Sequence, residues 1–189
     1  MFTRHAPRIT SSMSETTLIL NNTGIERALT RIAHEIAERN EVSAEIVLVG
    51  IQRGGVSVAE RLAKNLSQIW NAPVPCGSLD VNMHRDDLGQ RAAPTVHPTL
   101  IPFDVTGKTV VLVDDVLFSG RTIRAAMDAL TDFGRPKRIQ LAVLVDRGHR
   151  ELPIKADYVG KNQPTAPKEK IHVRLAVPGA QDEIVLERP

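Results

Sequence analysis

The stretch of residues 110–122 constrains the fold of this chain more than any other. It begins with the apolar run V-V-L-V, a composition typical of a strand that is buried on both faces of a parallel sheet. The acidic pair Asp114 and Asp115 follows, and then a short turn at residues 119–122, which reads S-G-R-T. Apolar residues recur after this turn at helical spacing. The pattern therefore predicts a strand, an acidic turn and a helix, in that order.

The turn between this strand and this helix has the chemistry of a phosphate site. Its backbone N–H groups and hydroxyls lie just before a helix N-terminus, where the helix dipole adds positive potential. The carboxylates of Asp114 and Asp115 stand at the carboxyl end of the strand, where open α/β sheets bind ligands. They repel a phosphate, so their partner is either a pair of sugar hydroxyls or a metal ion. A phosphorylated sugar satisfies both halves of the motif, and the simpler alternative is an ordinary turn with an acidic helix cap.

The composition is that of one soluble globular domain with a sizeable core. The chain has 189 residues, of which 42% are hydrophobic and 24% charged. Its formal net charge is only +2, so any basic surface for nucleic acid must be local. No apolar run approaches the roughly 20 residues of a membrane span. Residues 1–17 contain no apolar signal segment and predict a disordered leader, which leaves residues 18–189 as a single domain.

Cys76 is the only cysteine, which excludes an intrachain disulfide. A chain without disulfides fits a reducing compartment, so we expect a cytoplasmic protein. Because Cys76 lies beside the start of a predicted strand, we expect it to pack rather than to react.

Strands that alternate with helices along the chain predict an α/β fold with a parallel sheet. Residues 18–20 form a short candidate strand, and Thr23 with Glu26 fits a capping box at the start of the first helix. Residues 46–50 read as a buried strand. Further strands are predicted at residues 76–83, 138–145, 157–160, 171–176 and 183–187.

Two loops add candidate ligand contacts. The glycine-rich turn at residues 52–55 follows a buried strand, and glycine there lets the backbone approach an anion closely. Arg53 in this turn adds positive charge. The polar stretch from His84 to about Thr99 has no periodicity and lies just before the motif strand. Such a long loop is often a lid over a site, and simple disorder is the alternative.

The motif at residues 110–122 closely resembles the phosphoribosyl-pyrophosphate (PRPP) motif of type I phosphoribosyltransferases. The resemblance implies that family's fold: a central, mostly parallel sheet flanked by helices, with a flexible lid loop. It implies that the acids hold the ribose 2′ and 3′ hydroxyls, that the following loop holds the 5′-phosphate, and that Mg²⁺ enters with PRPP rather than being held by the protein alone. On this basis PRPP binds at Asp114, Asp115, Val116, Leu117, Phe118, Ser119, Gly120, Arg121 and Thr122, and its pyrophosphate faces Arg53, Gly54 and Arg85.

Three stretches, namely residues 27–35, residues 120–130, and residues 144–154 together with 156–162, resemble one branch of that family, the bifunctional pyrimidine-operon regulators. The resemblance implies synthesis of UMP from uracil and PRPP, and binding of pyrimidine leader messenger RNA in response to uridine nucleotides such as UMP and UTP. It also implies a homodimer or a larger homo-oligomer. The base pocket would include Arg147, Tyr158 and Val159. The RNA surface would include Thr30, Arg31, His34, His149, Arg150, Lys155 and Lys161.

The chain departs from that branch at several positions. The usual Thr-Arg-Gly of the pyrophosphate loop is Arg53-Gly54-Gly55 here, so the arginine is displaced by one position. Purine-using relatives carry an acid where Phe118 stands, which favours a pyrimidine as the base. Two alternatives to the bifunctional protein stay open: a salvage enzyme that binds no RNA, and an RNA-binding regulator whose nucleotide site is only a sensor.

Overall fold

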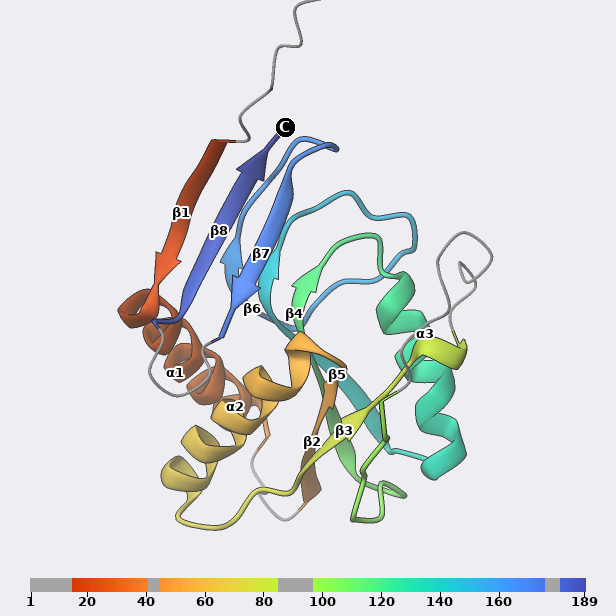
Figure 1. The fold of residues 1–189 in the computed structure, drawn as a ribbon. Helices are drawn as coiled ribbons and strands as arrows, with labels where there is room; N and C mark the ends of the chain where they lie inside the picture. The colour runs from red at the N-terminus through yellow and green to blue at the C-terminus, as the bar shows by residue number, and fades with distance from the viewer. Residues whose placement is uncertain (1–14, 41–44, 85–96, 176–180) are drawn as a thin grey trace, which may run out of the picture.

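The computed structural model describes residues 15–40, 45–84, 97–175 and 181–189. Its centre is a five-stranded parallel sheet with the strand order β3-β2-β4-β5-β6, so the motif strand β4 occupies the middle (Figure 1). This sheet confirms the predicted α/β class. Its strands are β2 (Ile46–Ile51), β3 (Cys76–Leu79), β4 (Thr109–Leu117), β5 (Arg138–Asp146) and β6 (Tyr158–Asn162).

Helices cover both faces of this sheet and divide the core in two. Beneath α1 (Asn22–Arg39) and α2 (Gly54–Trp70) lies one apolar cluster, and beneath α3 (Arg121–Leu130) lies the other. Burial of these apolar surfaces supplies most of the driving force for folding. The structure also contains two short 3-10 turns, η2 (Asn82–His84) and η4 (Thr131–Phe133). Among the described residues, none of the helices combines the length and the apolar character that a membrane crossing requires.

The first helix begins earlier than its sequence predicts. Its N-cap is Asn21, whose side-chain oxygen accepts a hydrogen bond from the backbone N–H of Gly24 at 2.9 Å. The predicted capping box at Thr23 and Glu26 is therefore wrong. Asparagine is as good an N-cap as threonine, and the helix starts at the upstream candidate.

A small antiparallel sheet joins the two ends of the described chain. Its order is β1 (Glu15–Asn21), β8 (Glu183–Arg188) and β7 (Lys170–Arg174), with the red first strand beside the blue last strand in Figure 1. Residues 15–17 pair with residues 186–188 of β8, so they belong to this sheet and the predicted leader boundary at residue 17 is corrected. The rest of that predicted leader, residues 1–14, lies outside the described residues.

An ion-pair group fastens the small sheet to the helices. Arg61 of α2 donates hydrogen bonds to Asp182, which precedes β8, and to Glu26 of α1 at 3.1 Å. Asp182 is only 5% exposed, and its hydrogen bond with Arg61 raises the pKa of the guanidinium. Removing one partner of such a part-buried pair leaves the other charge poorly solvated, so the group holds β8 in place.

The environment of Cys76 predicts a thiol that reacts slowly. Burial raises the pKa of Cys76 to about 11, so the thiol stays protonated at neutral pH. Because the thiolate is the reactive form, we expect iodoacetamide to label the native protein slowly and the denatured protein fully, as followed by mass spectrometry. Equal labelling rates in the two states would contradict this environment.

Candidate active site

The two acids of the motif lie at the carboxyl end of β4 and are oriented by their own backbone. Asp114 is buried, with 7% of its surface exposed, and Asp115 is partly buried. The backbone N–H of Asp115 donates to Asp114 Oδ1 at 2.9 Å, and that of Val116 donates to Asp115 Oδ1 at 2.8 Å. These bonds hold both carboxylates in place before any ligand arrives, which reduces the entropy lost on binding.

The glycine-rich turn after β2 packs directly onto this acidic pair. A Cβ atom added to Gly54 would overlap the carboxylate of Asp115, and one added to Gly55 would overlap the carbonyl oxygen of Val113. Only glycine permits this approach, and the two predicted loops therefore form one wall. Arg53 lies at the edge of this wall, where its exposed side chain has no hydrogen bond or ion pair within the described residues. The peptide bond between Gln52 and Arg53 is cis.

The loop after β4 turns its carbonyl groups away from the space above the helix N-terminus. The carbonyl oxygens of residues 117–119 all accept hydrogen bonds from the segment 147–152. A phosphate dianion is repelled by carbonyl oxygens and attracted by N–H groups, so this arrangement suits an anion. The bonds run from Arg147 N to Leu117 O (3.1 Å), from Arg150 Nη1 to Phe118 O (2.8 Å), and from Glu151 N and Leu152 N to Ser119 O (3.0 and 3.1 Å).

Gly120 makes the turn from this loop into α3. Its φ of 91° lies in the left-handed region, which glycine adopts without the strain that a Cβ atom brings. The first helical bond runs from Arg124 N to Gly120 O at 3.0 Å. The N–H groups of the first helical turn have no partner within a helix, so they are directed toward the loop. Ser119 and Thr122 add hydroxyls at the same place, and both are partly exposed.

Comparison with known proteins agrees with this geometry. The model of the phosphoribosyl transferase domain family matches residues 15–178. A protein named bifunctional protein PyrR from Roseiflexus sp. (strain RS-1) is 61% identical over 172 residues, covering 90% of this chain and 94% of that protein. Proteins of the same name from Geobacter sp. (strain M21) and Listeria monocytogenes serovar 1/2a are 54% and 51% identical, each over 93% of this chain and over 100% and 99% of their own lengths.

The chain belongs to the PyrR family of phosphoribosyltransferases. Solved structures at lower identity share its fold. A hypoxanthine-guanine phosphoribosyltransferase from Bacillus anthracis is 21% identical with a TM-score of 0.62, covering 80% of this chain and 85% of that one. A hypoxanthine phosphoribosyltransferase from Trypanosoma cruzi is 22% identical with a TM-score of 0.61, covering 81% and 78%. The predicted type I phosphoribosyltransferase fold of this PyrR-family chain is thereby confirmed.

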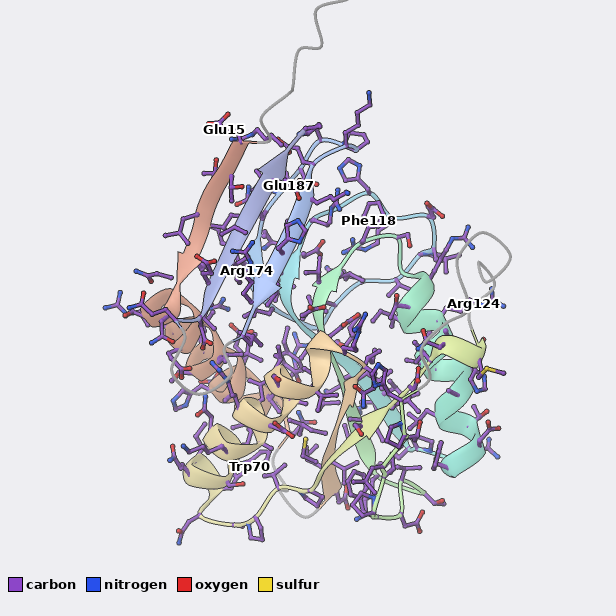
Figure 2. All side chains as sticks on the ribbon, viewed as in Figure 1. Glu15, Trp70, Phe118, Arg124, Arg174 and Glu187 are labelled. Atoms are coloured by element: carbon purple, nitrogen blue, oxygen red, sulfur yellow. The ribbon has the colours of Figure 1, made fainter. Side chains whose placement is uncertain are left out.

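Arg147, an expected base-pocket residue of the PyrR family, is occupied in joining two loops. It is 8% exposed, and its guanidinium lies 4.3 Å from the ring centre of Phe118, which Figure 2 labels on the loop after β4. It donates to Thr165 Oγ1 at 3.1 Å and to the carbonyl oxygen of Glu169 at 2.7 Å. Burial lowers the pKa of this arginine. Its side chain therefore braces the loop 163–169 against Phe118.

The other two expected base-pocket residues are adjacent in β6 and face opposite ways. Tyr158 is 1% exposed in the core beneath α1, and its hydroxyl accepts a hydrogen bond from Asn40 Nδ2 at 3.3 Å. Its side chain therefore belongs to the core, and its expected role beside the base stays a prediction. Side chains alternate across a strand, so Val159 faces the α3 side of the sheet, where it is partly exposed and stays a candidate.

The residues expected at the RNA surface of PyrR proteins are not equally available. His34, Lys155 and Lys161 are exposed, and within the described part of the chain their side chains form no hydrogen bond or ion pair. The hydroxyl of Thr30 donates to the carbonyl oxygen of Glu26 in its own helix.

Arg31 links α1 to the edge strand of the large sheet. Its Nη2 donates to the carbonyl oxygens of Val159 and Gly160 at 3.0 and 2.7 Å, and its Nη1 pairs with Glu35. Half of its side chain stays exposed. Arg31 can therefore contact an RNA only with the part of its guanidinium that is not bonded to the carbonyl oxygens of β6.

His149 and Arg150 lie beside the loop at residues 117–122, the expected phosphate loop. His149 Nε2 is 2.5 Å from the carbonyl oxygen of Thr165, and its ring meets that of Phe118 edge-on at 6.0 Å between centres. Arg150 donates to four acceptors, one of them in the phosphate loop. Sequence reasoning missed these contacts and missed Asp146, which organises them. The available signal was the D-x-G pattern at residues 146–148, which is typical of a tight turn.

The expected lid follows His84 in the sequence and ends near Thr99. Arg85 and the rest of residues 85–96 lie outside the described residues, so the role expected for Arg85 stays a prediction. The flanking residues His84 and His97 are described: His84 lies in η2, and the backbone N–H of His97 donates to Asp80.

Proposed function

We propose that this chain makes UMP and diphosphate from uracil and PRPP, and that it binds pyrimidine leader messenger RNA in response to uridine nucleotides. The observation that carries the first activity is one site with two oriented carboxylates beside a loop whose carbonyls face away. The carboxylates suit ribose hydroxyls and the loop suits a phosphate. The name shared by its relatives, bifunctional protein PyrR, supports two activities in one chain.

In this mechanism the chain fixes the ribose at two points. Asp114 and Asp115 accept hydrogen bonds from the 2′ and 3′ hydroxyls, and the loop 117–122 donates to the 5′-phosphate. The bond from ribose C1 to diphosphate then breaks through an oxocarbenium-like state, the bond from C1 to uracil N1 forms, and the N1 proton is lost. Holding the reactants in this geometry removes much of the entropic barrier.

Mg²⁺ fits this site as a companion of PRPP. It prefers oxygen ligands and keeps several waters, and the acidic pair offers carboxylate oxygens near the ribose. The described residues contain no group of three His, Cys, Asp or Glu side chains that could hold a metal ion. When bound together with PRPP beside Asp114 and Asp115, Mg²⁺ would supply positive charge for the leaving diphosphate. Arg53 and Gly54 face the side where the diphosphate leaves.

The base and the RNA are assigned to different regions. Val159 and the loop that Arg147 braces border the base, and Phe118 stands where purine-using relatives carry an acid. RNA meets the exposed basic residues of α1 and β6. We further propose that the protein is cytoplasmic and assembles as a homodimer or a larger homo-oligomer.

One preparation, assayed twice, tests this function. UMP formation is measured by chromatography, and binding of the organism's own pyrimidine leader RNA is measured with and without UMP against an unrelated RNA of equal length. Turnover without selective RNA binding would support the alternative of a salvage enzyme that binds no RNA. Selective RNA binding without turnover would support the alternative of a regulator whose nucleotide site is only a sensor.

Lys161→Gln separates the two activities. The side chain of Lys161 is exposed and forms no hydrogen bond or ion pair with the described residues, so replacing it breaks no such contact of the fold. We expect weaker leader-RNA binding and nearly unchanged UMP synthesis. The slope of log affinity against log salt should fall by about one unit for one lost phosphate contact.

Arg31→Gln is the companion variant, since Arg31 also covers the edge of β6. It should weaken RNA binding in the same way and lower the melting temperature as well. Unchanged RNA affinity and salt slope in Lys161→Gln would remove this residue from the RNA surface.

A further inference from the structure

Arg150 donates side-chain hydrogen bonds to four acceptors, one of which lies in the expected phosphate loop. Its guanidinium donates to the carbonyl oxygens of Ile154 (2.9 Å), Phe118 (2.8 Å) and Gly148 (3.1 Å), and to Asp146 Oδ2 (2.5 Å). Only 24% of the side chain is exposed. A guanidinium whose three nitrogens all donate to the protein has few N–H groups left for RNA, although the sequence predicts an RNA role for it.

A tight turn delivers Arg150 to this position. Asp146 Oδ1 accepts a hydrogen bond from the backbone N–H of Gly148 at 3.0 Å, while Oδ2 of the same carboxylate holds Arg150. Gly148 and His149 follow with φ values of 79° and 59°, both in the left-handed region. Two such residues in succession reverse the chain, and Asp146 thereby fixes the start of the turn and the side chain at its end.

The bond to Phe118 has a consequence for the phosphate. Among the three loop carbonyls that face away from the anion, those of Leu117 and Ser119 are held by backbone N–H groups, and only that of Phe118 is held by a side chain. Without this donor the peptide after Phe118 is free to rotate and present its oxygen to the phosphate. One side chain therefore controls whether the loop favours an anion.

We propose that Arg150 is a positioning residue for the 5′-phosphate: it holds the Phe118 carbonyl away from the anion, through a turn that Asp146 organises. The proposal rests on the proposed function, which places a phosphate in this loop. It assigns Arg150 to nucleotide binding and leaves the RNA surface to the exposed basic residues.

The proposal predicts a loss of ligand affinity that occurs only when the ligand carries a phosphate group. UMP and uridine differ only in that group, so their affinities are compared by calorimetry for the wild type and each variant. Arg150→Gln should weaken UMP binding about tenfold or more, the effect of one charge-assisted hydrogen bond. Uridine binding should change by no more than about twofold, the usual range for substitutions that lose no contact with the ligand.

Two more variants distinguish the effect of the position of the Arg150 guanidinium from the effect of its charge. Arg150→Lys keeps the charge but lacks the planar fork that reaches several acceptors, so its UMP affinity should stay well below that of the wild type. Asp146→Asn leaves Arg150 in the chain and loosens its anchor, and it should weaken UMP binding in the same direction. Arg135→Gln is the matched control, because Arg135 is exposed in the turn before β5, and it should bind UMP as the wild type does.

The outcomes are distinct. Unchanged UMP affinity in Arg150→Gln, equal losses for UMP and uridine, or full recovery in Arg150→Lys would each overturn the positioning role. If Arg150→Gln fails to fold, Asp146→Asn decides the question on the same comparison. Failure of the wild type itself to bind UMP would instead reject the proposed function.

Discussion

Replacing Asp115 by asparagine is expected to abolish UMP synthesis in a protein that still folds. The side chain keeps its shape, and its oxygen can still accept from Val116 N. The second oxygen becomes an NH₂ group, which donates where a ribose hydroxyl needs an acceptor. Each charge-assisted bond lost costs roughly 1.5–3 kcal/mol, and the loss is greatest where charge develops on the ribose in the transition state.

The measurement is kcat/KM for PRPP together with the thermal midpoint. Asp128→Asn is the matched control, since Asp128 lies on α3 with 56% of its side chain exposed and should retain full activity. Near-normal PRPP affinity and turnover in Asp115→Asn would remove the acidic pair from the site.

Gly54→Ala is expected to have a comparable effect by a steric route. The added methyl group would overlap the Asp115 carboxylate, so either the carboxylate or the turn after β2 must move. Small displacements of a positioned group cost large factors in rate, and we expect a loss of about 100-fold. UMP synthesis is followed at saturating uracil across a range of PRPP concentrations.

Gly107→Ala is the control for the general effect of replacing a glycine by alanine. At Gly107 φ is 74° and a Cβ atom would meet nothing within 4 Å, so alanine there brings strain without overlap. It should lower stability by about 1 kcal/mol and leave turnover unchanged. An active Gly54→Ala protein would show that Asp115 does not depend on this close packing.

The site was predictable where its parts are adjacent in sequence. The apolar run of β4, the acidic pair, Gly120 and the helical spacing of α3 lie within one continuous stretch, and each feature has a local physical cause. The turn at residues 52–55 was also recognisable from its glycines. Its contact with Asp115 was not, because that contact arises only when parallel strands bring their carboxyl ends together.

Residues that depend on distant partners were harder to interpret. Tyr158 and Val159 are neighbours in one strand, and nothing local indicates which of the two faces the core; the contact with Asn40 decides it. Arg150 and Lys161 are both basic residues within residues 144–162, the region that resembles the pyrimidine-operon regulators. One is held by four acceptors and the other is exposed, a difference set by the turn at Asp146 and by the loop it contacts.

The pairing of β1 with β8 has a consequence for how the chain is made. Residues 15–21 are synthesised long before their partner strand, residues 183–188. Contacts between such distant segments form slowly, because a long loop must close first. The large sheet can assemble while synthesis continues, whereas β1 stays unpaired, as an open strand edge, until residues 183–188 have emerged. A ribosome stalled before residue 183 therefore carries a nascent chain whose residues 15–21 are accessible to protease, and pairing with residues 183–188 then protects them.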